Sequence, residues 1–349
     1  MRKQLENVFR NKKILVTGGT GCIGSEIVRS LLAYKPKVVR IFSNDEDSTF
    51  RMMQELGGCS NVRFLVGDVR DKERLSLAME DINIVYHAAA LKHVPLCEYN
   101  PFEAIKTNVM GTQNVIEAAF SNDVNRVINI STDKAVSPVN TMGATKLLAE
   151  KLIIDANEGK GTKKTIFSCV RFGNVLFSRG SVIPLFEKQI RQKKPITITD
   201  PDMTRFVMPI SSTVGLVFKA TIMTKGGEVF ILKMPVVKLG DLTDAVIEKY
   251  SRKYGYKKKD IKKKIVGTRA GEKIFEELMT ETEAEMAFET EEMMIIPPQL
   301  EIPNIKFEVK DYQNAVHSKL NRYISKDVKP LSKEEIIRIL NENEPKTLL

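Results

Sequence analysis

An apolar run, a glycine-rich turn and an amphipathic segment follow one another near the start of this 349-residue chain. Residues 13–16 predict a buried strand, and apolar residues recur at helical spacing over residues 27–32. Between them, Gly18 allows a tight turn, Gly21 lets backbone N–H groups approach a pyrophosphate, and Gly24 lets the helix pack on the sheet. Strand, glycine turn and helix in this order predict a Rossmann-type α/β fold with a doubly wound parallel sheet.

Further β-branched, apolar runs predict parallel strands at residues 38–42, 62–66, 82–86 and 126–130. The end of the second strand normally contacts the adenosine ribose: an acidic residue there favours NAD, and a basic one NADP. Here Ser43-Asn44 occupies the turn, with Asp45 and Glu46 just beyond. Both cofactors stay open, with a slight preference for NADP because the turn itself lacks a carboxylate.

The fourth strand opens onto His87 and three alanines, Ala88, Ala89 and Ala90. The small side chains leave room for a cofactor against the backbone, although packing under a helix would also explain them. We expect His87 to be a core histidine. Lys92 and His93 follow the alanines and are better placed to meet a substrate.

The stretch from Ser131 to Lys146 carries the most reactive side chains of the chain. It follows a predicted strand, so Thr132, Asp133 and Lys134 should lie at the carboxyl edge of the parallel sheet, where α/β folds bind ligands. Lys146 should project from the helix that comes next. An ordinary strand-to-loop ending followed by a helix start is the alternative interpretation of this stretch taken alone.

Composition excludes several classes of protein. The four cysteines and three histidines have no metal-ligand spacing, so we expect no metal site. The chain lacks the roughly 20-residue apolar run of a membrane helix and an N-terminal signal peptide, which predicts a cytoplasmic protein.

Much of the net charge of +10 lies in residues 257–264, where no aromatic residues interleave to stack bases. We therefore expect no nucleic-acid partner, while a basic surface would attract an anionic, nucleotide-linked substrate.

The glycine turn and the Thr132-to-Lys146 stretch together resemble the extended short-chain dehydrogenase/reductases, which carry Tyr-x-x-x-Lys on the helix. Met142 stands at the tyrosine position. Longer pieces resemble the UDP-N-acetylglucosamine 4,6-dehydratases of polysaccharide biosynthesis over nearly the whole chain. These pieces are Ala88–Pro95, Glu98–Pro101, Ser131–Lys134, Gly143–Lys146, Arg171–Val175, Ser178–Pro184, Asp202–Phe206 and Gly271–Lys273.

The resemblance implies a dinucleotide-binding domain over residues 1–175 and a smaller, interleaved α/β part that binds a UDP-sugar over residues 176–349. It implies NAD or NADP, tightly bound and recycled in each cycle. The expected cofactor-binding residues are Gly18, Thr20, Gly21, Cys22, Ile23, Gly24, Ser43, Asn44, Asp68, Val69, Ala88, Ala89, Ala90 and Lys146.

For the substrate, the resemblance implies contacts from Lys92, His93, Asn174, Arg179, Arg205 and Glu272, and a guanidinium suits a diphosphate. The expected catalytic residues are Thr132, Asp133, Lys134, Met142 and Lys146. Lys134 would be the C5 base and Asp133 the acid for the C6 hydroxyl, with Lys134 partly neutral through burial and the nearby Lys146.

Met142 raises two further expectations. A thioether cannot accept the C4 hydroxyl proton, so Asp133 or a water held by Lys146 would replace the tyrosine. Methionine at this position also resembles the branch of membrane-anchored dehydratases. Their N-terminal membrane region is not in this chain, so it resembles a free-standing catalytic domain that retains the C5 configuration.

Two rival functions stay open. A UDP-sugar 4-epimerase shares every step up to the 4-ketone, and a non-catalytic dinucleotide sensor would have lost activity with its tyrosine. A homo-oligomer is also expected. In the second half of the chain, residues 277–292 predict an acidic structural helix, and Ser332 starts a final helix with a capping box.

Overall fold

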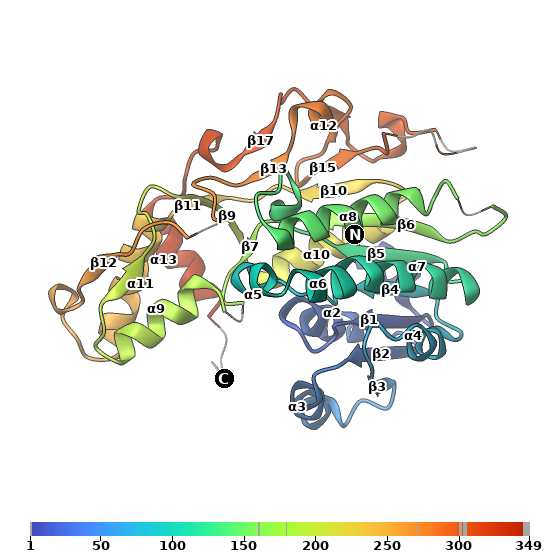
Figure 1. The fold of residues 1–349 in the computed structure, drawn as a ribbon, viewed down its shortest axis with the longest axis horizontal. Coiled ribbons are helices and arrows are strands. Elements are labelled where there is room, and N and C mark those ends of the chain that lie inside the picture. The colour runs from blue at the N-terminus through green and yellow to red at the C-terminus, as the bar shows by residue number, and fades with distance from the viewer. Residues whose placement is uncertain are drawn as a thin grey trace.

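The computed structural model describes residues 2–159, 161–178, 180–269, 271–299, 302 and 306–344. Its main feature is a ten-stranded sheet in the order β16-β14-β15-β10-β6-β5-β4-β1-β2-β3 (Figure 1). The strands from β3 to β10 are parallel, and β15, β14 and β16 continue the sheet in antiparallel pairing. The predicted Rossmann-type parallel sheet is confirmed.

The sheet strands include all five that the apolar runs of the sequence predicted, with β4 starting two residues later than expected. In the parallel part they are β1 (Lys13–Thr17), β2 (Val38–Ser43), β3 (Val62–Val66), β4 (Ile84–His87), β5 (Arg126–Ile130), β6 (Ile166–Arg171) and β10 (Val229–Leu232). The antiparallel strands are β14 (Phe288–Glu289), β15 (Met293–Ile296) and β16 (Val316–His317). The central strands are almost wholly buried, as expected for a parallel sheet that helices cover on both faces.

Two layers of helices cover the sheet. One contains α1 (Arg2–Phe9), α2 (Cys22–Leu32), α3 (Glu46–Leu56) and α10 (Ile210–Met223), and the other contains α4 (Lys72–Met79), α7 (Gly111–Ser121) and α8 (Thr141–Asp155). The helical segment that follows Asn100 consists of α6 (Pro101–Ala104), a π-helical turn (Ile105–Met110) and α7. The short helix α5 (Val94–Tyr99) precedes it. π-helical turns are frequent at functional sites.

A second hydrophobic core lies at one end of the sheet. It is built mainly from α9 (Val182–Arg191), α11 (Leu239–Lys253) and α13 (Lys333–Glu342), with β8 (Ile196–Ile198) paired to β12 (Lys263–Ile265). A three-stranded sheet, β11 (Val236–Lys238), β9 (Thr204–Met208) and β7 (Asn174–Val175), lies between this core and the large sheet (Figure 1). Residues after 175 thus contribute to both cores, and a domain boundary near 175 stays a prediction.

The predicted acidic helix at residues 277–292 is wrong. The chain there forms β13 (Glu277–Met279), paired with β17 (Tyr323–Ile324), then α12 (Glu281–Glu285) and β14, and β15 follows directly. Leu278 and Phe288 are buried in the main core, so tertiary packing has overridden the helical propensity of the glutamates. The predicted final helix is confirmed as α13, with the capping box of Ser332 and Glu335.

In the described part of the chain, the helices are all too short or too polar to cross a lipid bilayer. Within the same residues, no cluster of side chains could hold a metal ion.

Candidate active site

The glycine turn between β1 and α2 packs directly on the segment that follows β4. A Cβ atom added to Gly18 would lie 2.7 Å from the backbone of Ala89, and one on Gly24 would lie 2.2 Å from the carbonyl oxygen of Gly18. Gly18 also has a φ of +62°, a region that favours glycine. The N-terminus of α2, at Gly21, has no side-chain cap. Its first N–H groups are therefore left for an anion.

A cavity of about 330 Å³ lies over this turn and the ends of β2 and β3. Most of the predicted cofactor-binding residues line it: Gly18, Thr20, Gly21, Ser43, Asn44, Asp68, Val69, Ala88, Ala89 and Ala90, together with Asp45 and Arg70. Thr20 and Ser43 share a hydrogen bond between their hydroxyls at 2.7 Å. Asn44 donates to Asp68 at 3.0 Å. Hydrogen bonds between lining residues therefore hold this side of the cavity in place.

Arg70 brings a positive charge to the same cavity. Its Nη2 atom lies 2.7 Å from Oδ2 of Asp68 and its Nη1 atom 2.9 Å from Oε2 of Glu103. Burial raises the pKa of Asp68, but hydrogen bonds from Arg70 and Asn44 outweigh it and lower the pKa overall. Asp45 meanwhile accepts the backbone N–H of Ser48 at 2.9 Å and caps α3.

A second cavity of about 430 Å³ continues from the first, because Gly18, Gly21, Ala88, Ala90 and Leu91 line both. It contains the other predicted cofactor residues, Cys22, Ile23, Gly24 and Lys146, and the predicted site residues Lys92, His93, Thr132, Lys134, Met142 and Asn174. The structure therefore brings together residues from the turns after β1 and β4, from the end of β5 and the loop after it, and from α8, which the sequence placed on separate elements.

Met142 and Lys146 lie one helical turn apart on α8 and both face this cavity. Met142 is buried against Cys97 and Ala104. The Lys146 ammonium donates to the carbonyl oxygen of Ile130 at 2.7 Å, and burial lowers its pKa. Within the described residues, no tyrosine lines the cavity, so the absence of a phenol at position 142 is not compensated by another one.

His87 lies beneath the cavity as a core residue, as predicted. Its Nδ1 atom is 2.8 Å from the Thr17 hydroxyl and its Nε2 atom is 3.1 Å from the Thr112 hydroxyl. Burial lowers the pKa of His87 to about 3, so the ring stays neutral.

A third cavity of about 180 Å³ opens beyond Lys134 and Asn174, which line both it and the second cavity. Its lining includes the predicted Arg205 and Glu272, and also Asn140, Arg269, Lys273 and Glu276. Arg205 donates to the carbonyl oxygens of Thr204 and Lys273, both at 2.8 Å. Arg179, a predicted diphosphate ligand, lies outside the described residues.

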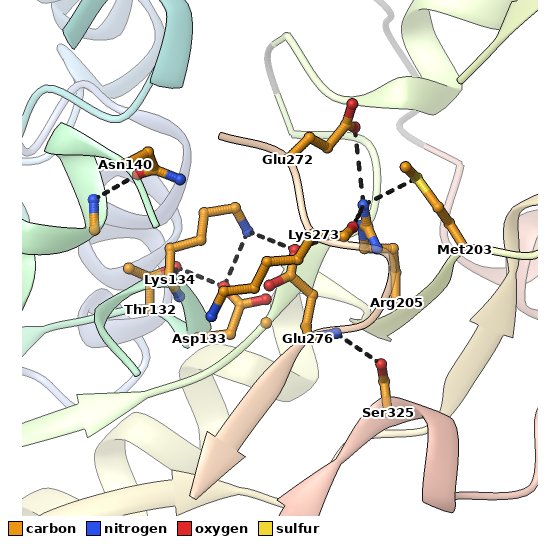
Figure 2. Close-up of polar contacts among 12 residues, drawn as sticks. Thr132, Asp133, Lys134, Asn140, Met203, Arg205, Glu272, Lys273, Glu276 and Ser325 are labelled. Atoms are coloured by element: carbon orange, nitrogen blue, oxygen red, sulfur yellow. Dashed lines mark hydrogen bonds and ion pairs between the residues drawn. The ribbon is translucent and has the colours of Figure 1, made fainter. Parts of the chain in front are cut away.

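Thr132, Asp133 and Lys134 form a connected group at the end of β5 (Figure 2). The Thr132 hydroxyl donates to Oδ1 of Asp133 at 2.8 Å, and Lys134 donates to the same oxygen at 3.0 Å. Asp133 is fully buried and is not among the residues that line the three cavities. The carboxylate therefore meets the cavity through the side chains of its two neighbours.

The protonation state expected for Lys134 is wrong. Burial lowers the pKa of this lysine, but the carboxylates of Asp133 and Glu276 raise it more, and the net shift is upward. Lys134 is therefore an ammonium in this structure. Lys146, which we expected to favour the neutral form, is not among the main causes of this shift, and its own ammonium donates to the carbonyl oxygen of Ile130.

Sequence reasoning missed Glu276. Its side chain is 4% exposed, and its Oε1 atom lies 3.7 Å from the Lys134 Nζ atom and 3.6 Å from the Arg205 Nε atom. Burial and the nearby Asp133 raise the pKa of Glu276 against the opposing effect of Lys134 and Arg205. The only sequence signal was its position three residues after Lys273. We used the piece Gly271–Lys273 only for the family resemblance.

A buried ion-pair network lies next to the Thr132–Lys134 group in the chain. Arg171 on β6 lies 2.7 Å from Oε2 of Glu150 on α8 and 3.0 Å from Oε1 of Glu283 on α12. The Ser131 hydroxyl donates to Glu150. This network ties the residue before Thr132 to the helix that carries Lys146 and to the second half of the chain.

The fold and the site define a nucleotide-binding α/β protein of the extended short-chain dehydrogenase/reductase type. The sequence profile of a family described as polysaccharide biosynthesis protein matches residues 14–298, and the chain belongs to this family. Similar proteins include an uncharacterized membrane protein of Methanocaldococcus jannaschii, 53% identical over 98% of this chain and 99% of that protein.

Another relative is named UDP-N-acetylglucosamine 4,6-dehydratase (inverting), from Campylobacter jejuni. It is 43% identical over 97% of this chain and 99% of its own length. The crystal structure of Pen from Bacillus thuringiensis has 45% identity and a TM-score of 0.89, covering 98% of this chain and 99% of its own. Relatives named UDP-glucose 4-epimerase also occur, such as that of Rickettsia rickettsii, 39% identical over 95% and 96% of the two chains.

Proposed function

We propose that this protein removes water across C5 and C6 of UDP-N-acetylglucosamine and forms the UDP-4-keto-6-deoxy sugar. The observation that carries the proposal is the group of Thr132, Asp133 and Lys134 at the carboxyl edge of the sheet, where a hydroxyl and an ammonium share one carboxylate oxygen. Dehydration needs a base and an acid within reach of neighbouring carbons. Such a group can take a proton from the substrate and return it while the substrate stays in the cavity.

A nicotinamide dinucleotide fits the joined first and second cavities. The glycines of the turn have no space for side chains, the α2 N-terminus is uncapped, and the buried Oδ1 atom of Asn174 has no hydrogen-bond partner among the described residues. When bound, the nicotinamide would accept hydride from C4 and return it to C6. The protein's own residues would hold it through Gly18, Gly21, Gly24 and Lys146.

The proton path follows from the contacts of Asp133. Met142 cannot take the C4 hydroxyl proton, and Thr132 lines the cavity with its hydroxyl bonded to Asp133. Asp133 therefore receives that proton through Thr132 and returns it through the same hydroxyl to the departing C6 oxygen, which leaves as water. Lys134 removes the C5 proton. Asp133 is thus both the acceptor that replaces the tyrosine and the acid.

The preference for NADP over NAD stays a proposal. It is supported by Ser43 and Asn44 at the end of β2 and by Arg70, whose guanidinium lines the same cavity. Asp45 also lines this cavity and would repel a 2′-phosphate. Titration of the cofactor-free protein with each dinucleotide tests the preference, and tighter binding of NAD would overturn it.

Two observations lead to opposite expectations for the C5 configuration of the product. Met142 led us to expect retention, whereas the Campylobacter jejuni relative carries the name inverting. We give more weight to near full-length similarity than to one side chain, and propose inversion. Proton NMR of the fresh product distinguishes the L-arabino from the D-xylo 4-keto sugar, and a D-xylo product would restore the expectation from Met142.

A UDP-sugar 4-epimerase is the second candidate, favoured by the relatives of that name. An epimerase needs no base for C5, and Lys134 would then have no chemical task. Incubation with UDP-N-acetylglucosamine followed by mass spectrometry decides between the two. Loss of one water supports the dehydratase, an altered sugar of unchanged mass supports the epimerase, and no change supports a dinucleotide sensor.

We also propose that a second copy of this chain covers an apolar face formed by α5, α6, the π-helical turn and α8. Leu96, Tyr99, Phe102, Met110 and Leu148 are each more than half exposed there, and contiguous exposed apolar patches mark interaction sites. Light scattering on the purified protein should give a mass of at least two chains, and Tyr99→Lys should lower it. A monomer would overturn this proposal.

A further inference from the structure

Three groups in the site can hold protons, and one of them has no task in the proton path proposed above. Lys134 lies between the carboxyl groups of Asp133, at 3.0 Å, and Glu276, at 3.7 Å (Figure 2). As an ammonium it cannot remove the C5 proton. Before it can act as the base, it must lose a proton to another group.

Glu276 is placed to accept that proton. It lines the third cavity at the rim that Lys134 shares with the second, and its buried Oε2 atom has no hydrogen-bond partner among the described residues. Burial of a carboxyl oxygen without a hydrogen-bond partner favours the neutral, protonated form of the group. The pKa of Glu276 is accordingly raised. Asp133 accepts two hydrogen bonds at Oδ1, and its buried Oδ2 atom, like Oε2 of Glu276, has no hydrogen-bond partner among the described residues.

The backbone fixes Glu276 in this position. Its N–H donates to the Ser325 hydroxyl at 2.9 Å, and its carbonyl oxygen accepts the Ser325 N–H at 2.8 Å. Nearby, the Lys273 ammonium donates to the carbonyl oxygen of Val136 at 2.8 Å, in the loop that follows β5. The segment that carries Glu276 is thus attached both to the end of β17 and to the loop that carries Lys134.

From this geometry, and on the basis of the proposed dehydratase function, we propose that Glu276 takes the proton that Lys134 must lose to become the C5 base. The charged groups around Glu276 are Asp133 and Lys134 in the loop that follows β5, Arg205 on β9, and Lys273 on its own segment. Arrival of the C4 hydroxyl proton neutralises Asp133 and removes the charge that holds the ammonium. A short side-chain movement then brings Glu276 and Lys134 to hydrogen-bond length.

The protons and electrons balance through the cycle. An N–H bond of the Lys134 ammonium breaks and its proton binds Glu276, which leaves a neutral amine and a neutral carboxyl group. The C5–H bond breaks, its proton goes to the amine, and its electron pair forms the C5=C6 double bond as the C6–O bond breaks. The C6 oxygen leaves as water with the proton from Asp133. Lys134 returns a proton to C5 when hydride reaches C6, and Glu276 then returns its proton to Lys134.

The test compares Glu276→Gln with wild type by product formation and by deuterium incorporation at C5 in deuterium oxide. Glutamine keeps the size of the side chain but cannot accept the proton. We expect both rates to fall roughly 100-fold at pH 7 and to recover as the pH rises toward the ordinary lysine pKa of about 10.4. The KM should change by less than about threefold, because no substrate contact is assigned to this residue.

Two further variants keep the test decisive. Glu277→Gln is the matched control, because the neighbouring Glu277 carboxylate instead accepts the Ser137 hydroxyl at 2.8 Å, and it should leave rate and pH profile unchanged. Glu276→Asp retains a titratable group that is pulled back from Lys134, so it should be slower than wild type with a pH profile of wild-type shape.

A wild-type pH profile and labelling rate in Glu276→Gln would overturn the role of Glu276 while the dehydratase function stands. If Glu276→Gln does not fold, an undiminished rate in Glu276→Asp would overturn it as well. Failure of the wild type to release water from UDP-N-acetylglucosamine would remove both proposals.

Discussion

The hydroxyl of Thr132 and the ammonium of Lys134 donate to the same oxygen of Asp133, at 2.8 Å and 3.0 Å. Asp133 itself is fully buried. Because the two donors line the cavity and the acceptor does not, a proton that enters at Thr132 can change the charge beside Lys134 without crossing open solvent. In the proposed reaction, oxidation at C4 and proton removal at C5 would thereby be linked through one carboxylate.

Loss of the shared hydroxyl should interrupt this path. We expect Thr132→Val to lower turnover roughly 100-fold, in the range for a positioned proton-transfer group, because valine cannot pass a proton to Asp133. Thr132→Ser keeps the hydroxyl and should retain most of the activity. Steady-state assays of both variants check this, and equal activity of the valine and serine variants would show that another route serves the C4 proton.

Loss of the lysine should stop the reaction one step later. Lys134→Ala is expected to lower product formation by roughly 100- to 10,000-fold and to abolish deuterium incorporation at C5. Cofactor affinity should stay unchanged, because the glycine turn and Lys146 are intact. The matched control is Lys238→Ala, an exposed lysine at the end of β11. Normal C5 labelling in Lys134→Ala would exclude this lysine as the base.

The close packing of the glycine turn predicts a stability effect. Gly24→Ala would place a methyl group 2.2 Å from the Gly18 carbonyl oxygen, so we expect it to destabilise the protein by about 1–3 kcal/mol and to weaken dinucleotide binding. Gly215 on α10 has open space where a Cβ would lie. Gly215→Ala should instead stabilise by about 0.5–1 kcal/mol. Chemical denaturation of both variants is the measurement, and equal effects would contradict the packing argument.

The buried network around Arg171 predicts a second stability effect. Replacing Arg171 by Leu leaves Glu150 without its partner in the interior, which should cost about 3–5 kcal/mol of unfolding free energy. Arg252, which pairs with Glu248 on the surface, serves as the control: Arg252→Gln should change stability by less than about 0.5 kcal/mol. A small effect of Arg171→Leu would show that this buried ion pair contributes little to stability.

The same network gives a pH dependence. Burial raises the pKa of Glu283, but Arg171 outweighs it and lowers the pKa overall. A carboxyl group with a lowered folded-state pKa contributes stability above its ordinary pKa of about 4.3, and this contribution is lost as the pH falls through the folded-state value. Unfolding free energy should therefore fall below about pH 4.3, and less steeply in Glu283→Gln. Identical slopes in the two proteins would contradict this assignment.

The sequence predicted best where local pattern and burial agree. The strand, glycine turn and helix at residues 13–32 depend on backbone space that only glycine leaves, so β1 and α2 could be placed from residue types alone. Thr132, Asp133 and Lys134 were found because they follow a strand directly. Residues 277–292 were mistaken for a helix, because burial of Leu278 and Phe288 in the core is invisible to local pattern.

The protonation of Lys134 could not be predicted for a related reason. It depends on Asp133, the preceding residue, and on Glu276, which is 142 positions away in the chain and whose backbone pairs with Ser325. A charge placed by tertiary structure leaves no local signal. We considered burial, which favours a neutral lysine, together with Lys146, and did not weigh the carboxylates of Asp133 and Glu276, which reverse the outcome.

The continuation of the large sheet into the second half of the chain restricts how the protein can admit its ligands. β10 pairs with β6 along Val229–Ile231, and β15 pairs with β10 in turn, so main-chain hydrogen bonds join the half that carries Arg205 and Glu276 to the half that carries Lys134. A hinged opening of two rigid lobes would break this ladder. Ligand exchange is therefore expected without a rotation of whole domains against each other. The spacing of Lys134 and Glu276 would then be set by the sheet before any ligand arrives.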